Sequence, residues 1–208
     1  MRKQTVEERR NEILETTIQV VIERGFGAIR VTDVADRLGV SSGLIHYHFE
    51  SKDQLLAEAF RYAADADLSR LHDEVGKGGS ALEQLDRVFG LYSPVEAEPG
   101  WMLWIDGWGE ALRRDDLRAI SQDLDLQWKE QLERIIADGV VAGELSCDDP
   151  HATAWRLTAL LDGLGLQVTV HGGLIDRTEL VEWVRASACR ELGLPQGTFS
   201  RLPAPAVA

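Results

Sequence analysis

The sequence has no apolar stretch long enough to cross a membrane, and it has very little cysteine. No run of about 18 apolar residues occurs in its 208 residues, so we expect no membrane span. No apolar segment follows the polar N-terminus, so we expect no secretory signal. Cys147 and Cys189 stand far apart, which argues against a disulfide framework or a cysteine metal site. We therefore expect a cytoplasmic protein with reduced thiols.

Positive charge is also scarce. The formal net charge is −13, and the acidic excess is uneven, because residues 1–60 carry a net −2 and residues 61–208 a net −11. Phosphate binding needs a local cationic face rather than a basic chain, so the first part of the sequence remains compatible with nucleic acid. The side chains that could form such a face are Arg2, Lys3, Arg9, Arg10 and Lys52.

Strand patterns and catalytic motifs are missing. No segment alternates with a period of two, whereas apolar residues recur at three- and four-residue spacing, which predicts an all-α protein of about nine helices. We find no phosphate-binding glycine loop, metal-ligand cluster or nucleophile–base pattern. His46 and His48 are two residues apart and point to different helix faces, so they cannot form a metal pair. His171-Gly172-Gly173 lacks an accompanying Gly-x-Ser-x-Gly and is better explained as a helix end. We predict no enzyme activity, no cofactor and no metal.

The stretch from Gly39 to Phe49 has the pattern of a turn followed by a recognition helix. Gly39 suits the left-handed end of one helix, and Ser41 suits the N-cap of the next. Leu44, Ile45 and Phe49 form an inward edge, which leaves a face of serine, histidine and tyrosine for the groove of a duplex. This pattern predicts a helix-turn-helix DNA-binding unit.

Caps and apolar spacing predict the other helices and the domain limits. We expect helices over about 6–24, 31–38, 42–48, 52–74, 81–92, 101–113, 116–142, 150–171 and 177–192. Capping boxes are predicted at Thr5, Ser51 and Ser80. Gly76 opens a flexible break. We therefore predict a helix-turn-helix domain over residues 1–60 with a linking helix to about 75, a second helical domain over 76–194, and a disordered tail over 195–208.

The order of these features resembles the TetR family of bacterial transcriptional regulators, most strongly over residues 9–60. The strings that carry the resemblance are Gly25-Phe26, Val31-Thr32-Asp33-Val34-Ala35, Gly39-Val40-Ser41-Ser42-Gly43, Phe49 and Ser51-Lys52-Asp53-Gln54-Leu55-Leu56. Weaker likeness lies in Gly143-Glu144-Leu145, Asp149-Pro150 and Leu161-Asp162-Gly163-Leu164. The sequence departs from the family pattern at Arg30, where threonine is usual, and at His46, where tyrosine is frequent. The resemblance implies a dimer that releases DNA when a small molecule enters its C-terminal domain.

The predicted DNA contacts lie on the second, third and fourth helices. We expect phosphate contacts from the start of the recognition helix and base contacts from its exposed face. An alternative for Tyr47 is packing within the protein. The predicted set is Thr32, Ser41, Ser42, Gly43, His46, Tyr47, His48 and Lys52.

The second part of the chain is rich in aromatic residues. An aromatic interior suits a flat or apolar ligand, although such residues also fill ordinary cores. We expect the effector to contact Phe89, Trp104, Trp108 and Trp128, with Asp162 supplying polarity. Asp106 is a second polar candidate, and Asp162 could instead brace helix packing.

Apolar residues on the last two helices are candidates for a dimer interface. By the resemblance, two helices from each subunit form a four-helix interface. The candidates are Leu157, Leu161, Leu164, Val168, Leu180 and Val184, and burial within one subunit is the alternative.

The helix-turn-helix pattern and the family resemblance together predict a homodimeric, ligand-responsive transcriptional regulator of the repressor type that is most frequent in the family, with residues 76–194 as its ligand-binding and dimerisation domain. Its expected partners are a palindromic double-stranded operator and a small apolar or aromatic effector, with no membrane partner. The alternative is a helical small-molecule carrier or enzyme that keeps the fold without using DNA.

Overall fold

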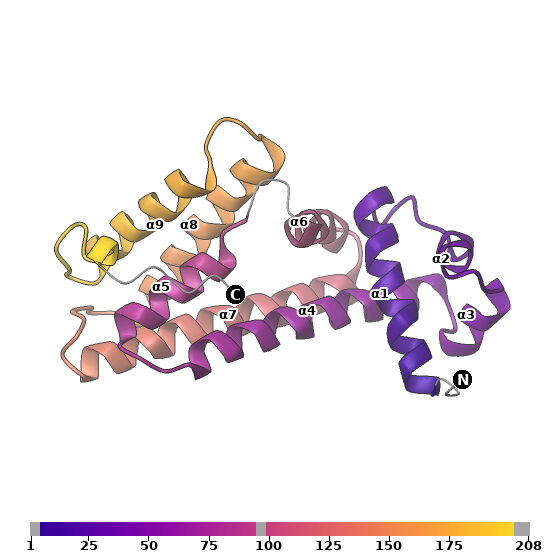
Figure 1. Ribbon diagram of the computed structural model, residues 1–208, viewed down its shortest axis with the longest axis horizontal. Coiled ribbons are helices and arrows are strands. Elements are labelled where there is room, and N and C mark those ends of the chain that lie inside the picture. The colour runs from indigo at the N-terminus through magenta and orange to yellow at the C-terminus, as the bar shows by residue number, and fades with distance from the viewer. Residues whose placement is uncertain (1–4, 95–98, 202–208) are drawn as a thin grey trace. The chain divides into compact units, whose positions relative to one another are not determined.

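The computed structural model describes residues 5–94 and 99–201. Its described residues form nine α-helices and one short 3-10 helix and contain no strand (Figure 1), which confirms the all-α prediction. The helices are α1 (Val6–Arg24), α2 (Val31–Leu38), α3 (Ser42–His48), α4 (Lys52–Gly76), α5 (Ala81–Tyr92), α6 (Pro99–Ala111), α7 (Asp115–Val141), α8 (Pro150–Val170), α9 (Arg177–Glu191) and the 3-10 helix η1 (Phe199–Arg201). The candidate phosphate contacts Arg2 and Lys3, and residues 202–208 of the predicted tail, lie outside the described residues.

Local capping accounts for several helix starts. At α1 the Thr5 hydroxyl accepts from the Glu8 amide at 3.0 Å, and the Glu8 carboxylate accepts from the Thr5 amide at 2.8 Å. This reciprocal pair satisfies two amides that the helix leaves without partners. The predicted box at Ser80 is also complete. The box at Ser51 is only half formed, because Ser51 caps the Gln54 amide while the Gln54 side chain turns to a neighbouring amide.

The chain folds into two compact units. The first contains residues 1–67 and 102–124, and the second contains residues 68–101 and 125–208. Helices α4, α6 and α7 therefore each contribute to both units. A boundary drawn at Gly76 in chain order does not capture this division, because residues 102–124 join the unit that holds α1, α2 and α3.

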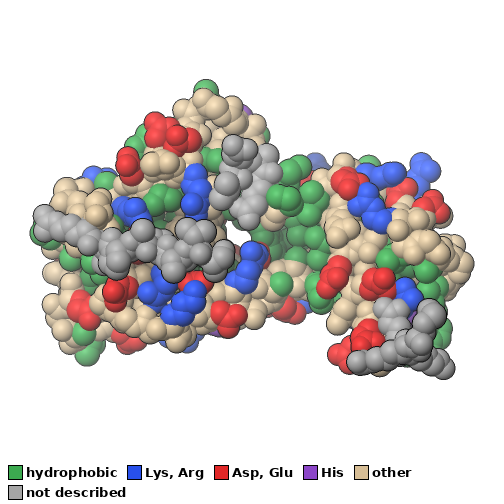
Figure 2. Space-filling view, in the orientation of Figure 1, with side chains coloured by type: hydrophobic (Ala, Val, Ile, Leu, Met, Phe, Trp, Pro, Cys, Tyr) green, Lys and Arg blue, Asp and Glu red, His purple; other side chains and the backbone are tan. Residues whose placement is uncertain are grey.

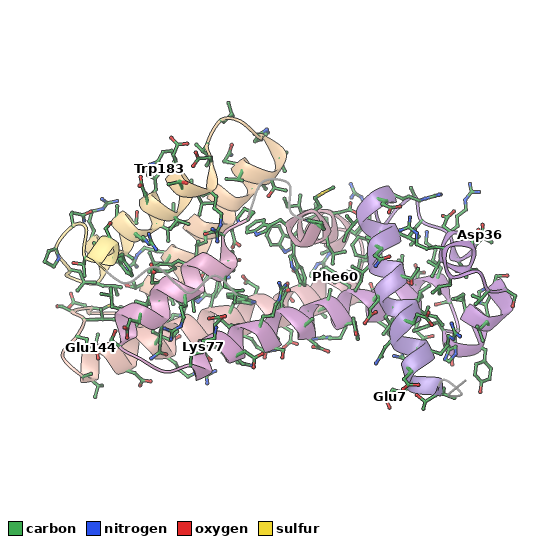
Figure 3. The ribbon with its side chains drawn as sticks, viewed as in Figure 1. Glu7, Asp36, Phe60, Lys77, Glu144 and Trp183 are labelled. Carbon is green, nitrogen blue, oxygen red and sulfur yellow. The ribbon has the colours of Figure 1, made fainter. Side chains whose placement is uncertain are left out.

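In the first unit α1 packs against α2, and α2 packs against α3. The buried side chains of the unit include Ile13, Val34, Ile45 and Phe60, each no more than 1% exposed. These residues come from four different helices, so burial of their apolar surface holds α1, α2 and α3 against the first part of α4. Figure 3 labels Phe60 on α4.

In the second unit α9 packs against both α8 and α5. Arg185 of α9 forms a two-point ion pair with Asp86 of α5, at 2.7 and 3.0 Å, and Asp86 is only 5% exposed. This pair fixes the two helices in one register, since a buried carboxylate without its partner would be costly.

Two expectations about the second unit need correction. Helix α6 begins at Pro99 rather than Trp101, because proline is well tolerated in the first turn of a helix. The expected disordered tail from Pro195 does not hold for residues 195–201. Phe199 is 2% exposed, and its ring lies 5.8 Å from the ring of Phe89. An apolar anchor therefore orders this part of the tail.

Candidate nucleic-acid interface and effector region

The turn between α2 and α3 has the geometry expected of a helix-turn-helix. Gly39 ends α2 with a φ of 68°, a left-handed conformation that glycine adopts without a steric penalty. The Val40 amide then donates to the carbonyl of Ala35 at 3.0 Å, which closes the end of α2. Ile45 and Phe49 are each 1% exposed, so they fix how far α3 is rotated about its axis.

Most of the predicted DNA-contact residues are exposed. Thr32, Ser41, Ser42, Gly43, His46 and Tyr47 are exposed, and His48 and Lys52 are half-buried. Tyr47 is 74% exposed, which argues against the alternative of packing within the subunit. Ser41 is the N-cap residue of α3, but its hydroxyl makes no capping hydrogen bond, so this hydroxyl is free to meet a phosphate oxygen.

Few cations remain for phosphate contacts. Arg9 pairs with Glu12 at 2.6 Å, and Arg10 pairs with Glu58 while its guanidinium lies 4.9 Å from the centre of the Phe49 ring. Their assignment as phosphate contacts is therefore weakened, because both charges are already neutralised.

Over α2, cationic and acidic side chains lie next to each other on the face shown in Figure 2. Arg24 pairs with Asp33 at 2.8 Å, and Arg37 pairs with a glutamate of α1. Among the described residues of this region, Arg30 and Lys52 form no ion pair. The charges of these two cations are therefore not neutralised by a carboxylate, and the phosphate contact of Lys52 stays a prediction.

An aromatic cluster with one carboxylate lies in the second unit. The Tyr92 ring meets the Trp101 ring at 5.7 Å and 76°, and the Trp128 ring at 4.9 Å and 86°. The Tyr92 hydroxyl donates to a carboxylate oxygen of Asp162, and the Trp101 indole N–H donates to the Tyr92 carbonyl at 3.0 Å. Gly165 of α8 makes room for the Trp101 ring, which a Cβ at that position would overlap. Helices α5, α6, α7 and α8 each supply one of the four side chains.

The carboxylate of this cluster is electrostatically unusual. Burial raises the pKa of the Asp162 carboxyl, and the Tyr92 hydrogen bond and the charge of Lys129 only partly offset this effect. Lys129 is itself paired with Asp125, and its ammonium lies 4.4 Å from the centre of the Trp155 ring. Two carboxylates, Asp125 and Asp162, and one ammonium, that of Lys129, therefore lie in this region.

The predicted effector residues divide between the two units. Trp128 and Asp162 belong to the cluster. Trp104 and Trp108 belong to the other unit, where the Trp104 indole donates to Asp67 at 2.7 Å. Phe89 is 0% exposed and its ring packs against the ring of Phe199, so it lies in the core of the second unit, and its contact with an effector stays a prediction.

Sequence reasoning missed Tyr92 and Trp101 as partners of Trp128 and Asp162. Both residues lie in the predicted aromatic region, but their contacts join helices far apart in the chain. Gly165 accommodates the Trp101 ring, but it lies on α8, so no local spacing in the sequence connects the two residues.

The candidate dimer residues are mostly internal. Leu157, Leu161, Val168, Leu180 and Val184 are at most 5% exposed within one subunit, so they cannot supply a surface for a second copy, and Leu164 is half-buried. The apolar side chains that α8 and α9 do expose are different ones. Trp155, Val170 and Trp183 are 42%, 52% and 45% exposed. Between Trp155 and Val170 on the same side of α8 lie the exposed residues Ala159 and Gly163.

Comparison with known proteins identifies both parts of the chain. Residues 13–59 match the family model described as bacterial regulatory proteins of the tetR family, and residues 81–193 match the BetI-type transcriptional repressor, C-terminal. The chain belongs to the TetR family. Its second match makes it a TetR-family transcriptional regulator of the BetI type.

Individual relatives agree with this assignment. The HTH-type transcriptional regulator BetI of Escherichia coli (strain K12) is 26% identical over 176 residues, which cover 82% of this chain and 87% of that protein. The solved structure of a transcriptional regulator from Saccharomonospora viridis in complex with choline is 29% identical, with a TM-score of 0.82, over 89% of this regulator and 98% of that chain. The solved structure of a TetR-family regulator from Rhodococcus sp. is 27% identical, with a TM-score of 0.75, over 90% of this regulator and 100% of that chain.

Two further properties concern the described residues as a group. No helix in this part of the regulator is long and apolar enough to span a membrane. Within the same residues, no three His, Cys, Asp or Glu side chains come together as a set of metal ligands.

Proposed function

We propose that this regulator is a homodimeric repressor that binds a palindromic operator in the cytoplasm and releases it when a small quaternary ammonium cation binds. The observation that carries the proposal is the cluster of Tyr92, Trp101, Trp128 and Asp162. Three rings in nearly perpendicular pairs beside a carboxylate offer the faces that attract a methylated ammonium group. The choline complex of the Saccharomonospora viridis relative supports this class of effector.

A cationic effector refines the expectation of an apolar or aromatic one. A neutral apolar ligand would leave the buried Asp162 carboxyl with a cost of ionisation, whereas a cation offsets that cost. Choline carries three methyl groups for the rings and one charge for the carboxylate. The chemistry of the cluster therefore favours choline over a neutral molecule of the same shape.

Titration calorimetry with choline and its uncharged carbon isostere, 3,3-dimethylbutan-1-ol, tests this effector class. We expect choline to bind at least about tenfold more tightly than the isostere, since a desolvated cation–π contact is worth roughly 2 kcal/mol. Asp162→Asn should weaken choline binding, while Asp148→Asn, an exposed carboxylate in the same unit, should not. Equal affinities for choline and the isostere would refute a quaternary ammonium effector.

The operator contact is assigned to α3. In this proposal His46 and Tyr47, which are exposed, contact base edges, and the Ser41 hydroxyl, which makes no capping hydrogen bond, contacts a phosphate. We expect Tyr47→Ala to lose operator binding in a mobility-shift assay, and Asp65→Ala, an exposed position on α4, to keep it. Full operator affinity of the Tyr47→Ala protein would contradict the role of α3.

The proposed dimer surface is the exposed side of α8 together with Trp183 of α9, which Figure 3 labels. Small residues at its centre, among them Gly163, let two helices approach closely, and the rings around them supply buried area. We expect Gly163→Arg to produce monomers in light scattering, and Ser69→Arg, on exposed α4 surface, to leave the dimer intact. A fully dimeric Gly163→Arg protein would exclude this surface.

Release of DNA follows as a shift between two populated arrangements. Two half-sites one duplex turn apart need recognition helices about 34–36 Å apart. The effector lowers operator affinity only if it binds more tightly to an arrangement with a different separation. In this proposal α6 carries the change, because it contributes Trp101 to the aromatic cluster and then continues into the unit that holds α3.

A further inference from the structure

Beyond Trp101, α6 makes a direct polar contact with the turn between α1 and α2. The Asp106 carboxylate accepts a hydrogen bond from the backbone amide of Phe26 at 2.7 Å. Phe26 is 2% exposed and follows Gly25, whose own amide makes the closing bond of α1 to Val21. The Phe26 amide therefore has no acceptor within α1. Without the Asp106 carboxylate this buried amide would lack a hydrogen-bond partner, which would lower the stability of the fold.

The turn between α1 and α2 is shaped to admit this carboxylate. Gly25 has a φ of 81°, and a Cβ there would lie 3.3 Å from the nearer carboxylate oxygen of Asp106. Glycine therefore provides both the backbone conformation and the space.

Aromatic packing surrounds the same contact. The Phe60 ring lies 5.5 Å from the Phe26 ring and 4.8 Å from the Trp104 ring. A Cβ at Gly107 would lie 2.6 Å from Phe60, so α6 and this ring are already in close contact. A displacement of α6 along its axis must therefore move Phe60, Phe26 or both.

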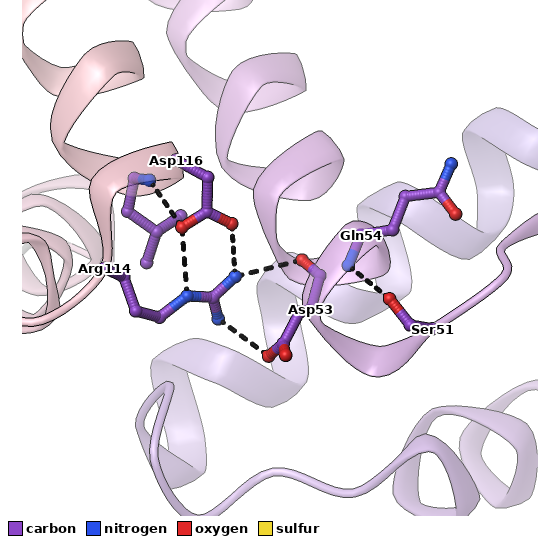
Figure 4. Close-up of polar contacts among 6 residues, drawn as sticks. Ser51, Asp53, Gln54, Arg114 and Asp116 are labelled. Carbon is purple, nitrogen blue, oxygen red and sulfur yellow. Dashed lines mark hydrogen bonds and ion pairs between the residues drawn. The ribbon is translucent and has the colours of Figure 1, made fainter.

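A second contact, made by Arg114 in the turn between α6 and α7, reaches the start of α4 (Figure 4). The Arg114 guanidinium donates to the Asp53 carbonyl at 3.0 Å and lies 3.4 Å from the Asp53 carboxylate. Asp116 holds the same guanidinium at 2.6 Å. Asp53 directly follows Lys52, a predicted phosphate contact, so Arg114 holds the backbone next to that residue.

We propose that Asp106 and Arg114 are positioning residues that transmit the state of α6 to the DNA-contacting helices, Asp106 through the α1–α2 turn and Arg114 through the first turn of α4. This inference rests on the proposed function. On α6, Asp106 follows Trp101 of the effector cluster by five residues. An effector that displaces α6 thus acts on the turn leading into α2 and α3, in addition to any push on α4.

Substitutions at Asp106 separate this role from a general loss of stability. Asp106→Ala removes the acceptor, and Asp106→Asn keeps an oxygen that can accept from Phe26. Asp123→Ala is the matched control, because it removes a carboxylate that pairs with Arg61 in the same unit but does not contact the α1–α2 turn. The operator is a duplex selected by the wild-type protein from a random library. The affinity of each protein for this duplex is measured by fluorescence anisotropy with and without saturating choline. The affinity of each protein for choline is measured by calorimetry.

We expect choline affinity to stay within about twofold in all three variants, as none touches the cluster. In the wild type choline should weaken operator binding by roughly 5- to 150-fold, the usual range of such couplings. Asp106→Ala should reduce this factor to below about twofold, while Asp106→Asn and Asp123→Ala keep it. Arg114→Ala should also lower it, and Arg114→Lys should not restore it, because an ammonium lacks the fork that reaches both Asp53 and Asp116.

The inference would be overturned if choline weakened operator binding by the wild-type factor in the Asp106→Ala protein. It would also be overturned if Asp106→Asn lowered this factor as much as Asp106→Ala does. If choline fails to bind the wild type, the proposed effector is wrong. The operator affinity measured without effector then tests whether Asp106 positions the DNA-contacting helices. In that case Asp106→Ala must weaken operator binding at least about fivefold while Asp106→Asn and Asp123→Ala do not. Equal affinities, or a wild type that selects no duplex, would overturn it.

Discussion

Two glycines of α6 make a sharp test of how this helix packs. At Gly107 a Cβ would lie 2.6 Å from two ring carbons of Phe60, which is 0% exposed. At Gly109, on the same helix, a Cβ would meet nothing within 4 Å. Alanine substitution therefore adds the same methyl group to one helix, once against a packed ring and once into open space.

The expected free energies follow from this difference. Alanine gains about 1 kcal/mol over glycine in a helix interior, so Gly109→Ala should stabilise the protein by roughly that amount. At Gly107 the same gain is opposed by overpacking, which costs about 1–3 kcal/mol in a close-packed interior. Phe26 and Trp104 flank Phe60, so the ring cannot move aside freely. Because both substitutions gain the same helix propensity, only the overpacking differs. The Gly107→Ala protein should therefore be less stable than the Gly109→Ala protein by about 1–3 kcal/mol.

Urea denaturation followed by far-ultraviolet circular dichroism measures the difference, with both variants at one protein concentration because the proposed dimer makes stability concentration-dependent. A double variant, Gly107→Ala with Phe60→Leu, should show a favourable interaction energy, since the smaller side chain leaves room for the methyl group. If Gly107→Ala is as stable as Gly109→Ala, the packing argument for α6 is refuted.

Three other predictions concern charge. Lys52→Ala should reduce the slope of log operator affinity against log salt by about two per dimer, close to one per lost phosphate contact, and an unchanged slope would remove Lys52 from the interface. Choline affinity should fall as pH falls through the raised pKa of Asp162, because protonation removes the counter-charge, and Asp162→Asn should abolish this pH dependence in calorimetry. The Arg114 hydrogen bond lowers the pKa of Asp116, so this pair stabilises the fold above the pKa of the unfolded state and loses its contribution as pH falls. Asp116→Asn should therefore flatten the acid side of the stability curve, and an unchanged curve would show that the pair contributes nothing.

Local chemistry let the sequence predict the helices and the recognition surface. The capping pair of Thr5 and Glu8 involves residues three apart, and the closing turn at Gly39 needs only the conformational freedom of one glycine. The inward edge of α3 follows from helical spacing, so Ile45 and Phe49 could be distinguished from exposed His46 and Tyr47 without a structure.

The candidate effector site depended on long-range contacts and was predicted only in part. Tyr92, Trp101, Trp128 and Asp162 lie on four helices, and no local spacing specifies that they meet. Phe89 has the same aromatic character, yet it fills the core against a residue of the C-terminal segment.

The sequence by itself determined the all-α fold and the exposed polar face of α3, because periodicity and capping depend on residues at most four positions apart, and its resemblance to the TetR family indicated a regulator. Only the tertiary structure decided which apolar side of α8 is buried, because that helix carries apolar residues nearly all round, with Leu157 and Leu161 inside and Trp155 and Val170 outside. It also decided that Asp106 contacts the turn at Phe26, 80 positions away, because such a contact depends on how helices pack rather than on their own sequences.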